Sequence, residues 1–181
     1  MCVEWLRVRP SLVLAVVCAC GSAEPRGTPP TPPPSTGETV PRVITPRAQL
    51  PSAIQPLLPK NGIYVAGGGF VSTPWRIVVD LDKKTIYAGT AETPNAPSFG
   101  PMDNESTKEL SPRNGSHLMK LAQAAWVEPP PKMPPDPSAD YDEILIVLEG
   151  DDTFYLQGYG PIRRPEAAKA IVEIRAAAGM Q

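Results

Sequence analysis

The sequence predicts an α+β fold: a two-layer sandwich in which a mostly antiparallel sheet of about five strands carries two helices on one face. Residues 75–81 alternate apolar and polar side chains, as a strand with one buried face does. Residues 143–148 contain the continuous apolar run 144–148, which favours a central strand. Two stretches that open on Pro112 and Pro165 repeat apolar residues at helical spacing. A sheet and two amphipathic helices bury their apolar sides most simply against each other.

The first 20 residues predict an export signal. Arg7 and Arg9 precede an apolar run that is shorter than the roughly 20 residues a membrane-spanning helix needs, but typical of a secretory signal. The run ends in Val17-Cys-Ala-Cys20, which resembles the lipobox of bacterial lipoproteins. The resemblance implies that residues 1–19 are a signal peptide and that Cys20 carries the lipid. Cys18 is the weaker candidate, because Val17 would occupy its small-residue position.

Composition agrees with an exported, membrane-anchored chain. All three cysteines lie within the first 20 residues, so the mature domain is expected to lack an internal disulfide, and lipidation uses the remaining thiol. Gly21, in place of an aspartate after the lipidated cysteine, favours the outer membrane by the same resemblance. The net charge of -2 gives no phosphate-neutralising surface, so we do not expect nucleic acid as a partner.

Proline content divides the chain. Residues 20–60 are predicted to form a lipid-anchored, proline-rich tether, and residues 61–181 a globular domain. Thr28–Pro34 is typical of an extended polyproline spacer. The second half of the tether carries apolar residues such as Leu50 and Ile54, and we expect it to lie partly on the domain surface. A spacer across the envelope is favoured over a ligand for an aromatic groove.

The domain is predicted to begin with a short strand and a hairpin. Residues 63–66 form the strand, which the glycines of residues 67–69 interrupt. Residues 75–81 and 85–88 form the two arms of the hairpin. Residues 89–104 are expected to be a loop that exposes Phe99 and Met102.

Helix signals follow this loop. Ser111 is expected to cap a helix with Pro112 in its first turn, and Gly115 moves the predicted regular start toward Ser116. The helix should end near Trp126, before a proline-rich crossover. A second hairpin and a second helix follow; the buried side of that helix is predicted to be Ala167, Ala168, Ile171, Val172 and Ile174.

Catalytic signals are weak. His117 is the only histidine, and no familiar nucleophile motif surrounds a serine, so we expect His117 to be a surface residue. The mature chain lacks the histidines and cysteines of a zinc site. Acidic residues gather near the predicted turns, where we expect solvated side chains and no metal or cofactor; they are Asp80, Asp82, Asp140, Asp142, Glu143, Glu149, Asp151 and Asp152.

Aromatic residues give the remaining indication of function. Trp75 and Phe154 are predicted to face the core. Exposed tyrosines on a sheet suit protein or glycan contacts, although ordinary covering of a sheet face explains them as well. The candidates on the opposite sheet face are Tyr64, Tyr87, Tyr155 and Tyr159.

One resemblance concerns the folded domain. Gly67-Gly-Gly-Phe70, a hairpin, Glu109-Leu-Ser-Pro112 leading into a helix, a proline-rich crossover and a second hairpin and helix resemble the emfourin-type inhibitors of thermolysin-like metalloproteases, over about residues 62–175. The anchor, the tether and the loop of residues 89–104 depart from that family. The resemblance implies protease inhibition and assigns no inhibitory residue.

Three functions follow from the sequence. The first is a non-catalytic binding or scaffold domain of an envelope lipoprotein, whose partner is an envelope protein or glycan. The second is a protease inhibitor of the cell envelope. The third is a hydrolase that uses turn carboxylates such as Asp80 and Asp151.

Overall fold

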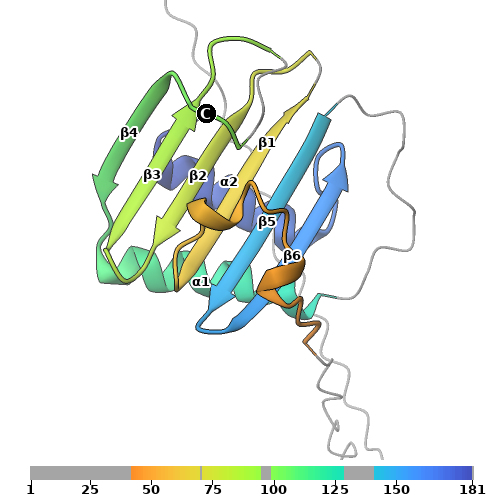
Figure 1. Ribbon diagram of the computed structural model, residues 1–181. Helices are drawn as coiled ribbons and strands as arrows, with labels where there is room; N and C mark the ends of the chain where they lie inside the picture. The colour runs from red at the N-terminus through yellow and green to blue at the C-terminus, as the bar shows by residue number, and fades with distance from the viewer. Residues whose placement is uncertain (1–41, 70, 95–98, 129–140, 181) are drawn as a thin grey trace, which may run out of the picture. The chain divides into compact units, whose positions relative to one another are not determined.

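The computed structural model describes residues 42–69, 71–94, 99–128 and 141–180. They form one six-stranded antiparallel sheet with two α-helices on one face, which confirms the predicted α+β sandwich (Figure 1). The predicted signal peptide, Cys20, the first half of the predicted tether, Asp140 and the second proline-rich crossover lie outside the described residues.

The sheet has the strand order β4-β3-β2-β1-β5-β6. Its strands are β1 (Gly62–Gly69), β2 (Trp75–Asp80), β3 (Thr85–Thr90), β4 (Asn104–Glu109), β5 (Tyr141–Glu149) and β6 (Asp152–Tyr159). β1 continues through the three glycines, which pair with residues 141–143 of β5. The predicted interruption at Gly67 is therefore wrong, because backbone pairing with β5 holds these residues in the strand.

β4 is the strand that the sequence analysis missed. It begins at Asn104, the last residue of the predicted loop, and pairs with β3 from Thr85 opposite Glu109 to Thr90 opposite Asn104. All six of its side chains are exposed. An edge strand that is exposed to solvent on both faces has no apolar face. Its sequence therefore lacks the alternation of apolar and polar residues that identifies a strand.

The helices are α1 (Pro112–Val127) and α2 (Pro165–Ala178). Ser111 Oγ accepts a hydrogen bond from the Asn114 amide at 3.2 Å, which confirms the predicted cap. The regular helix starts at Pro112 and is not delayed by Gly115. A Cβ at Gly115 would lie 3.1 Å from the Leu81 side chain, so the glycine permits close packing of α1 on the sheet.

The end of α1 and the start of α2 cap each other. Glu128, which follows α1, accepts hydrogen bonds from the amides of Glu166 and Ala167 at 3.3 and 3.4 Å. Arg164, which precedes α2, donates to the Ala125 and Glu128 carbonyls and lies 3.5 Å from the Glu128 carboxylate. These contacts satisfy amides and carbonyls that helix ends leave unpaired, and they fix the two helices to each other.

The main core lies between the sheet and the helices. β2 contributes Trp75, Ile77 and Val79, as its alternation predicts, and the rings of Phe154 and Trp126 stack with centroids 5.9 Å apart. α2 buries Ala167, Ile171 and Ile174 as predicted. Val172 is 64% exposed, contrary to the prediction, because α2 turns Ala170 and Ala178 to the core instead.

A second apolar cluster lies on the opposite face of β1 and β5. Leu50 and Ile54, from the segment before the first strand, cover Tyr64, Ala66, Ile144, Ile146 and Leu148. The segment includes two short 3-10 helices, η1 (Arg47–Gln49) and η2 (Gln55–Leu57), and crosses the front of the sheet in Figure 1. The folded unit spans Glu38–Gln181. The predicted domain start at residue 61 is therefore too late, because both faces of β1 and β5 are apolar and need cover.

Side-chain contacts hold the beginning of this segment in place. Arg42 pairs with the Glu149 carboxylate at 2.9 Å and lies 4.7 Å from the centroid of the Trp126 ring. Trp126 Nε1 donates to the Val43 carbonyl at 2.8 Å. The Thr45 amide donates to the Thr153 carbonyl of β6 at 2.8 Å. The chain thus enters the folded unit beside β6, the outermost strand on that side.

Candidate functional site

The N-terminal segment covers only part of the sheet face that lies opposite the helices. It lies over β1, β5 and β6, reaches β2 at Val78, and leaves the front of β3 and β4 uncovered in Figure 1. We call this uncovered part the open face. Its exposed or half-buried side chains are Val78, Thr85, Tyr87, Glu105, Thr107 and Glu109.

Three of the four predicted tyrosines lie on one sheet face. In the strand register, Tyr87 is opposite Val78, Val78 is opposite Tyr64, Tyr64 is opposite Ile146, and Ile146 is opposite Tyr155. Residues directly opposite each other in an antiparallel sheet share a face. The three tyrosines therefore stand in one cross-strand row on the face away from the helices.

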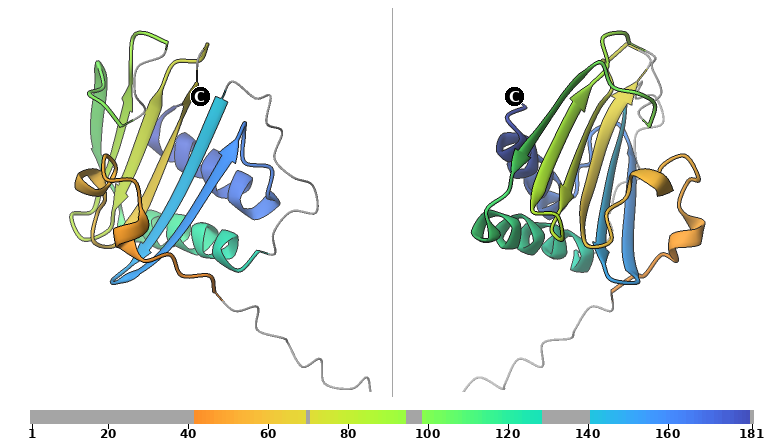
Figure 2. Two further views of the ribbon diagram at one scale, coloured as in Figure 1. Left: turned by 45° about the vertical axis from the view of Figure 1, so that its right-hand side comes forward. Right: turned by 60° about the vertical axis from the view of Figure 1, so that its left-hand side comes forward.

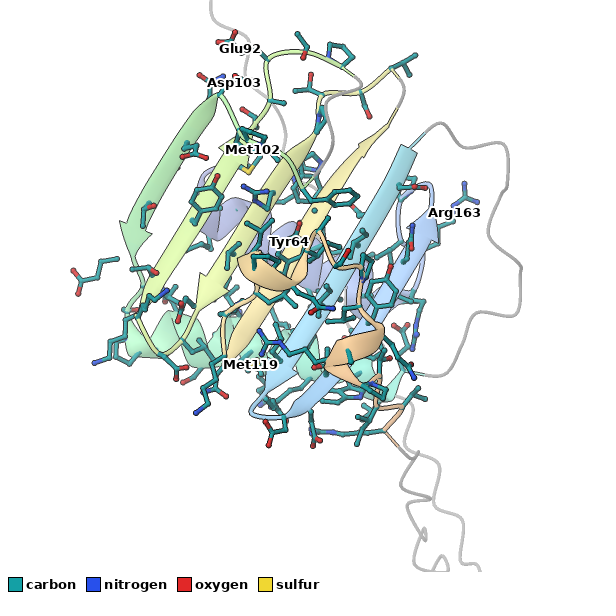
Figure 3. All side chains as sticks on the ribbon, in the orientation of Figure 1. Tyr64, Glu92, Met102, Asp103, Met119 and Arg163 are labelled. Carbon is teal, nitrogen blue, oxygen red and sulfur yellow. The ribbon has the colours of Figure 1, made fainter. Side chains whose placement is uncertain are left out.

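Only one of these tyrosines belongs to the open face. Tyr64 is fully buried beneath the N-terminal segment, so its prediction as an exposed contact residue is wrong (Figure 3). Tyr155 is half-buried at the margin of the same apolar cluster, and its hydroxyl donates to Gln157 Oε1 at 2.6 Å. Tyr87 is half-buried and uncovered. Tyr159 lies in β6, and its side chain is outside the described part of the structure.

A buried arginine supports Tyr87. Arg76 is only 6% exposed, although it lies on the face of β2 away from the helices. It donates to the Gly100 carbonyl at 3.1 Å and to the Tyr87 hydroxyl at 3.4 Å, and its guanidinium lies 5.5 Å from the centroid of the Tyr87 ring. Tyr87 in turn donates to Glu105 Oε1 at 2.6 Å. This chain of contacts fixes the Tyr87 ring across β2, β3 and β4.

Burial controls the ionisation of the two neighbouring phenols. Burial raises the pKa of Tyr64 to about 12, and the Arg76 guanidinium opposes this effect without cancelling it. The Tyr64 hydroxyl has no partner in hydrogen-bonding geometry among the described residues. The pKa of Tyr87 is also raised, first by burial and then by its hydrogen bond to Glu105. Both phenols are thus neutral at physiological pH.

The loop between β3 and β4 adjoins the open face. Met102 is buried against β3, where a Cβ added to Gly89 would come 2.8 Å from its side chain, so the prediction of an exposed Met102 is wrong. Phe99 is exposed as predicted. Asp103 accepts from the Glu92 amide at 2.8 Å and ties the two ends of the loop together (Figure 3).

Most of the turn carboxylates engage in structural contacts. Asp80 accepts from the Lys83 amide at 2.9 Å, and Asp82 accepts from Asn61, whose own oxygen accepts from the Gly150 amide at 2.7 Å. Glu149 binds Arg42 and Gln123. Glu143 is buried and accepts a hydrogen bond from the Ile162 amide. Asp142 is half-buried in β5. Asp151 and Asp152 are exposed at the β5–β6 turn.

The structure does not bring the other predicted chemistry together. His117 lies exposed on α1, as predicted. Among the described residues, no three His, Cys, Asp or Glu side chains group in a way that could hold a metal ion. None of the described helices is long and apolar enough to cross a membrane.

Arg76 is the residue that the sequence analysis overlooked. The alternation of apolar and polar residues along β2 places Arg76 on the other face of the sheet from Trp75. A polar side chain on that face was expected to be exposed to solvent. Its burial depends on the loop that supplies the Gly100 carbonyl and on Tyr87 from the next strand, neither of which is local in sequence. The sequence does hold one signal that this face is partly covered. It is the set of apolar residues in the predicted tether, Leu50, Ile54, Leu57 and Leu58.

Comparison with known proteins adds no assignment. No protein-family model matches the sequence, and no curated protein matches it. The similarity to lipoprotein signals and to emfourin-type inhibitors stays a prediction.

Proposed function

We propose that the chain is an envelope lipoprotein, anchored through Cys20, whose folded unit is a non-catalytic domain that binds an envelope protein or glycan through the open face. The signal-like N-terminus, the lipobox-like residues 17–20 and the proline-rich segment support the anchor and the tether.

One observation carries the binding proposal: the N-terminal segment covers the apolar half of this sheet face and stops short of the half around Tyr87. The two apolar clusters, one on each face of the sheet, already account for the apolar surface that the fold buries. The open face nevertheless holds Tyr87 in a fixed position through Arg76 and Glu105. A tyrosine that is fixed in advance loses little conformational entropy on contact, which suits it to recognition.

The side chains of the open face suit a polar partner surface. Tyr87 and Val78 offer ring and aliphatic area, Thr85 and Thr107 offer hydroxyl groups, and Glu105 and Glu109 add negative charge. Such a mixture of an aromatic with hydrogen-bonding groups is typical of contact surfaces that are not obligate.

The proposal is testable by photo-cross-linking in intact cells. A photo-reactive amino acid is placed at Thr107 on the open face or, as a matched control, at exposed His117 on α1. We expect a discrete cross-linked species from position 107 only, and its weakening by Tyr87→Ala. Equal products from both positions, or none from position 107, would contradict binding through the open face.

The anchor needs a separate test. Cells are fed an alkyne-bearing fatty acid, and the protein is examined for label in its native form and as Cys20→Ser. Label that survives the substitution places the lipid elsewhere, and Cys18→Ser then tests the alternative cysteine. If the cross-linked partner is a protease, inhibition assays with that protease decide for the inhibitor function.

A further inference from the structure

The two edge strands of the sheet differ in whether another segment of the chain hydrogen-bonds to their outer side. The outer side of β6 receives the Thr45 amide, which donates to the Thr153 carbonyl. β4, at the other edge, pairs only with β3 within the described residues, and all its side chains are exposed. The right-hand view of Figure 2 shows β4 as the outermost strand, with the end of α2 beside it.

The register identifies which backbone groups of β4 point outward. The Leu110 amide donates to the Lys84 carbonyl directly opposite it at 2.8 Å. Bonded and non-bonded positions alternate along an antiparallel pair, so residues 108, 106 and 104 also bond inward to β3. The amides and carbonyls of Glu105, Thr107 and Glu109 therefore face away from the sheet, where another strand would pair with them.

A groove runs beside this edge on the helix side. It has a volume of about 550 Å³, and its lining includes Asn104, Ser106, Lys108, Gly179 and Met180. Lys108 Nζ donates to the Ala178 carbonyl at the end of α2 at 3.0 Å, which holds its charge at the helix end. Alternate side chains of a strand added to β4 would point toward this groove, and the others toward Glu105 and Glu109.

We propose that β4 is a docking edge for an extended segment of a partner protein that carries basic residues at alternate positions. This deepens the proposed function, on which it rests. Main-chain hydrogen bonds to Glu105, Thr107 and Glu109 provide the pairing, and the carboxylates of Glu105 and Glu109 select lysine or arginine beside them. Small or apolar side chains between the basic ones enter the groove.

A second copy of the chain fits this edge poorly. Two identical antiparallel edge strands that keep their faces aligned must pair residues whose numbers sum to an even value. Two such registers pair five residues of β4 with each other. The register centred on Thr107 sets Glu105 against Glu109 of the other copy at both ends, and the register centred on Ser106 brings Glu109 opposite Asp103, the residue before the strand. Like charges directly opposite each other destabilise a strand pair. The edge therefore disfavours self-association and accepts a segment of opposite charge.

The first test uses the lipidated mature protein in detergent micelles and a peptide in which lysine alternates with valine. We expect saturable binding that weakens with added salt, together with slower hydrogen exchange at the amides of Glu105, Thr107 and Glu109. The same peptide N-methylated on its pairing amides keeps its charge but cannot add a strand. Equal binding of the two peptides, or no binding of either at millimolar concentration, would overturn the proposal.

The second test uses one position with two substitutions. Thr107→Pro removes an outward amide and no bond to β3, and we expect binding about tenfold weaker, which corresponds to about 1.4 kcal/mol. Thr107→Val keeps the amide but, like the proline variant, lacks the hydroxyl, so the loss of about tenfold for Thr107→Pro is measured against Thr107→Val. Thermal unfolding checks that both variants fold. Glu109→Lys should weaken binding and reduce its salt dependence.

Two outcomes separate this proposal from the one it rests on. If position 107 cross-links a partner in cells while Thr107→Pro binds that partner and the peptide normally, the open face binds but strand addition is wrong. If sedimentation shows a dimer that Thr107→Pro dissociates, the occupant of the edge is a second copy and the partner-strand proposal is wrong.

Discussion

Tyr64→Phe is the substitution with the sharpest expected outcome. The Tyr64 ring is fully buried between β1 and the N-terminal segment, and its hydroxyl has no hydrogen-bond partner among the described residues. Phenylalanine keeps the ring and removes only the unpaired oxygen. Leaving a buried polar group unpaired costs about 1–3 kcal/mol. The Arg76 guanidinium recovers part of that cost, so we expect the variant to be more stable at pH 7 by about 1 kcal/mol.

The gain should grow at alkaline pH. The pKa of Tyr64 is about 12 in the folded protein, against an ordinary value of 10. Above pH 10 the unfolded chain releases a proton that the folded protein retains, so the stability of the unaltered protein falls until the pH passes the folded pKa. At pH 11 this loss is about 1.4 kcal/mol, and it levels off at about 2.7 kcal/mol above pH 12. The variant lacks this loss.

Urea unfolding at pH 7 and pH 11 measures both effects. Tyr155→Phe is the matched control at pH 7, because it removes a hydroxyl that is bonded near the surface to Gln157, and we expect a change within about 0.5 kcal/mol. Tyr87→Phe should destabilise, because it leaves buried Arg76 with one contact fewer. A Tyr64→Phe protein less stable than the original at pH 7 would show that the hydroxyl has a partner and refute the reasoning.

Two further substitutions test the fold. Ile54→Ala should lower the free energy of unfolding by about 2–5 kcal/mol, because it opens a cavity under the N-terminal segment. Val43→Ala is the control: its side chain is 69% exposed, so the substitution should change the free energy of unfolding little. If urea unfolding shows the same small change for both, the segment does not belong to the folded unit. Gly62→Ala should prevent stable folding, because its Cβ would lie 1.9 Å from the Val79 carbonyl oxygen at a φ of 151°; a folded variant by circular dichroism would contradict this.

The fold was predictable because its signals are local. Alternation in β2, the apolar run of β5 and the cap at Ser111 each depend on a few neighbouring residues. The errors occurred where tertiary contacts decide. β4 shows no alternation of apolar and polar residues, because both its faces are exposed to solvent. The glycines of residues 67–69 stay in β1, because β5 pairs with them.

The candidate site was less predictable, since it depends on which part of a sheet face is covered. The sequence put Tyr64, Tyr87 and Tyr155 on one face correctly but did not distinguish them. That distinction comes from Leu50 and Ile54, which precede the first strand and which the proline content assigned to a tether. Arg76 escaped notice because its partners come from another strand and from a loop.

The chemistry of β2 explains where the cover stops. On the face away from the helices, β1 and β5 present Tyr64, Ala66 and three large aliphatic side chains, which an apolar segment buries without leaving charges unpaired. The next strand presents Arg76 and Asp80 on that face, followed by Glu105 and Glu109 on β4. Arg76 and Asp80 are already buried with partners of their own. An apolar segment extended as far as β4 would take the exposed carboxylates of Glu105 and Glu109 out of water, which is costly unless each is paired. The same residues that limit the N-terminal segment therefore leave Tyr87 and the β4 edge accessible, and a partner that docks there has to bring polar or basic groups of its own.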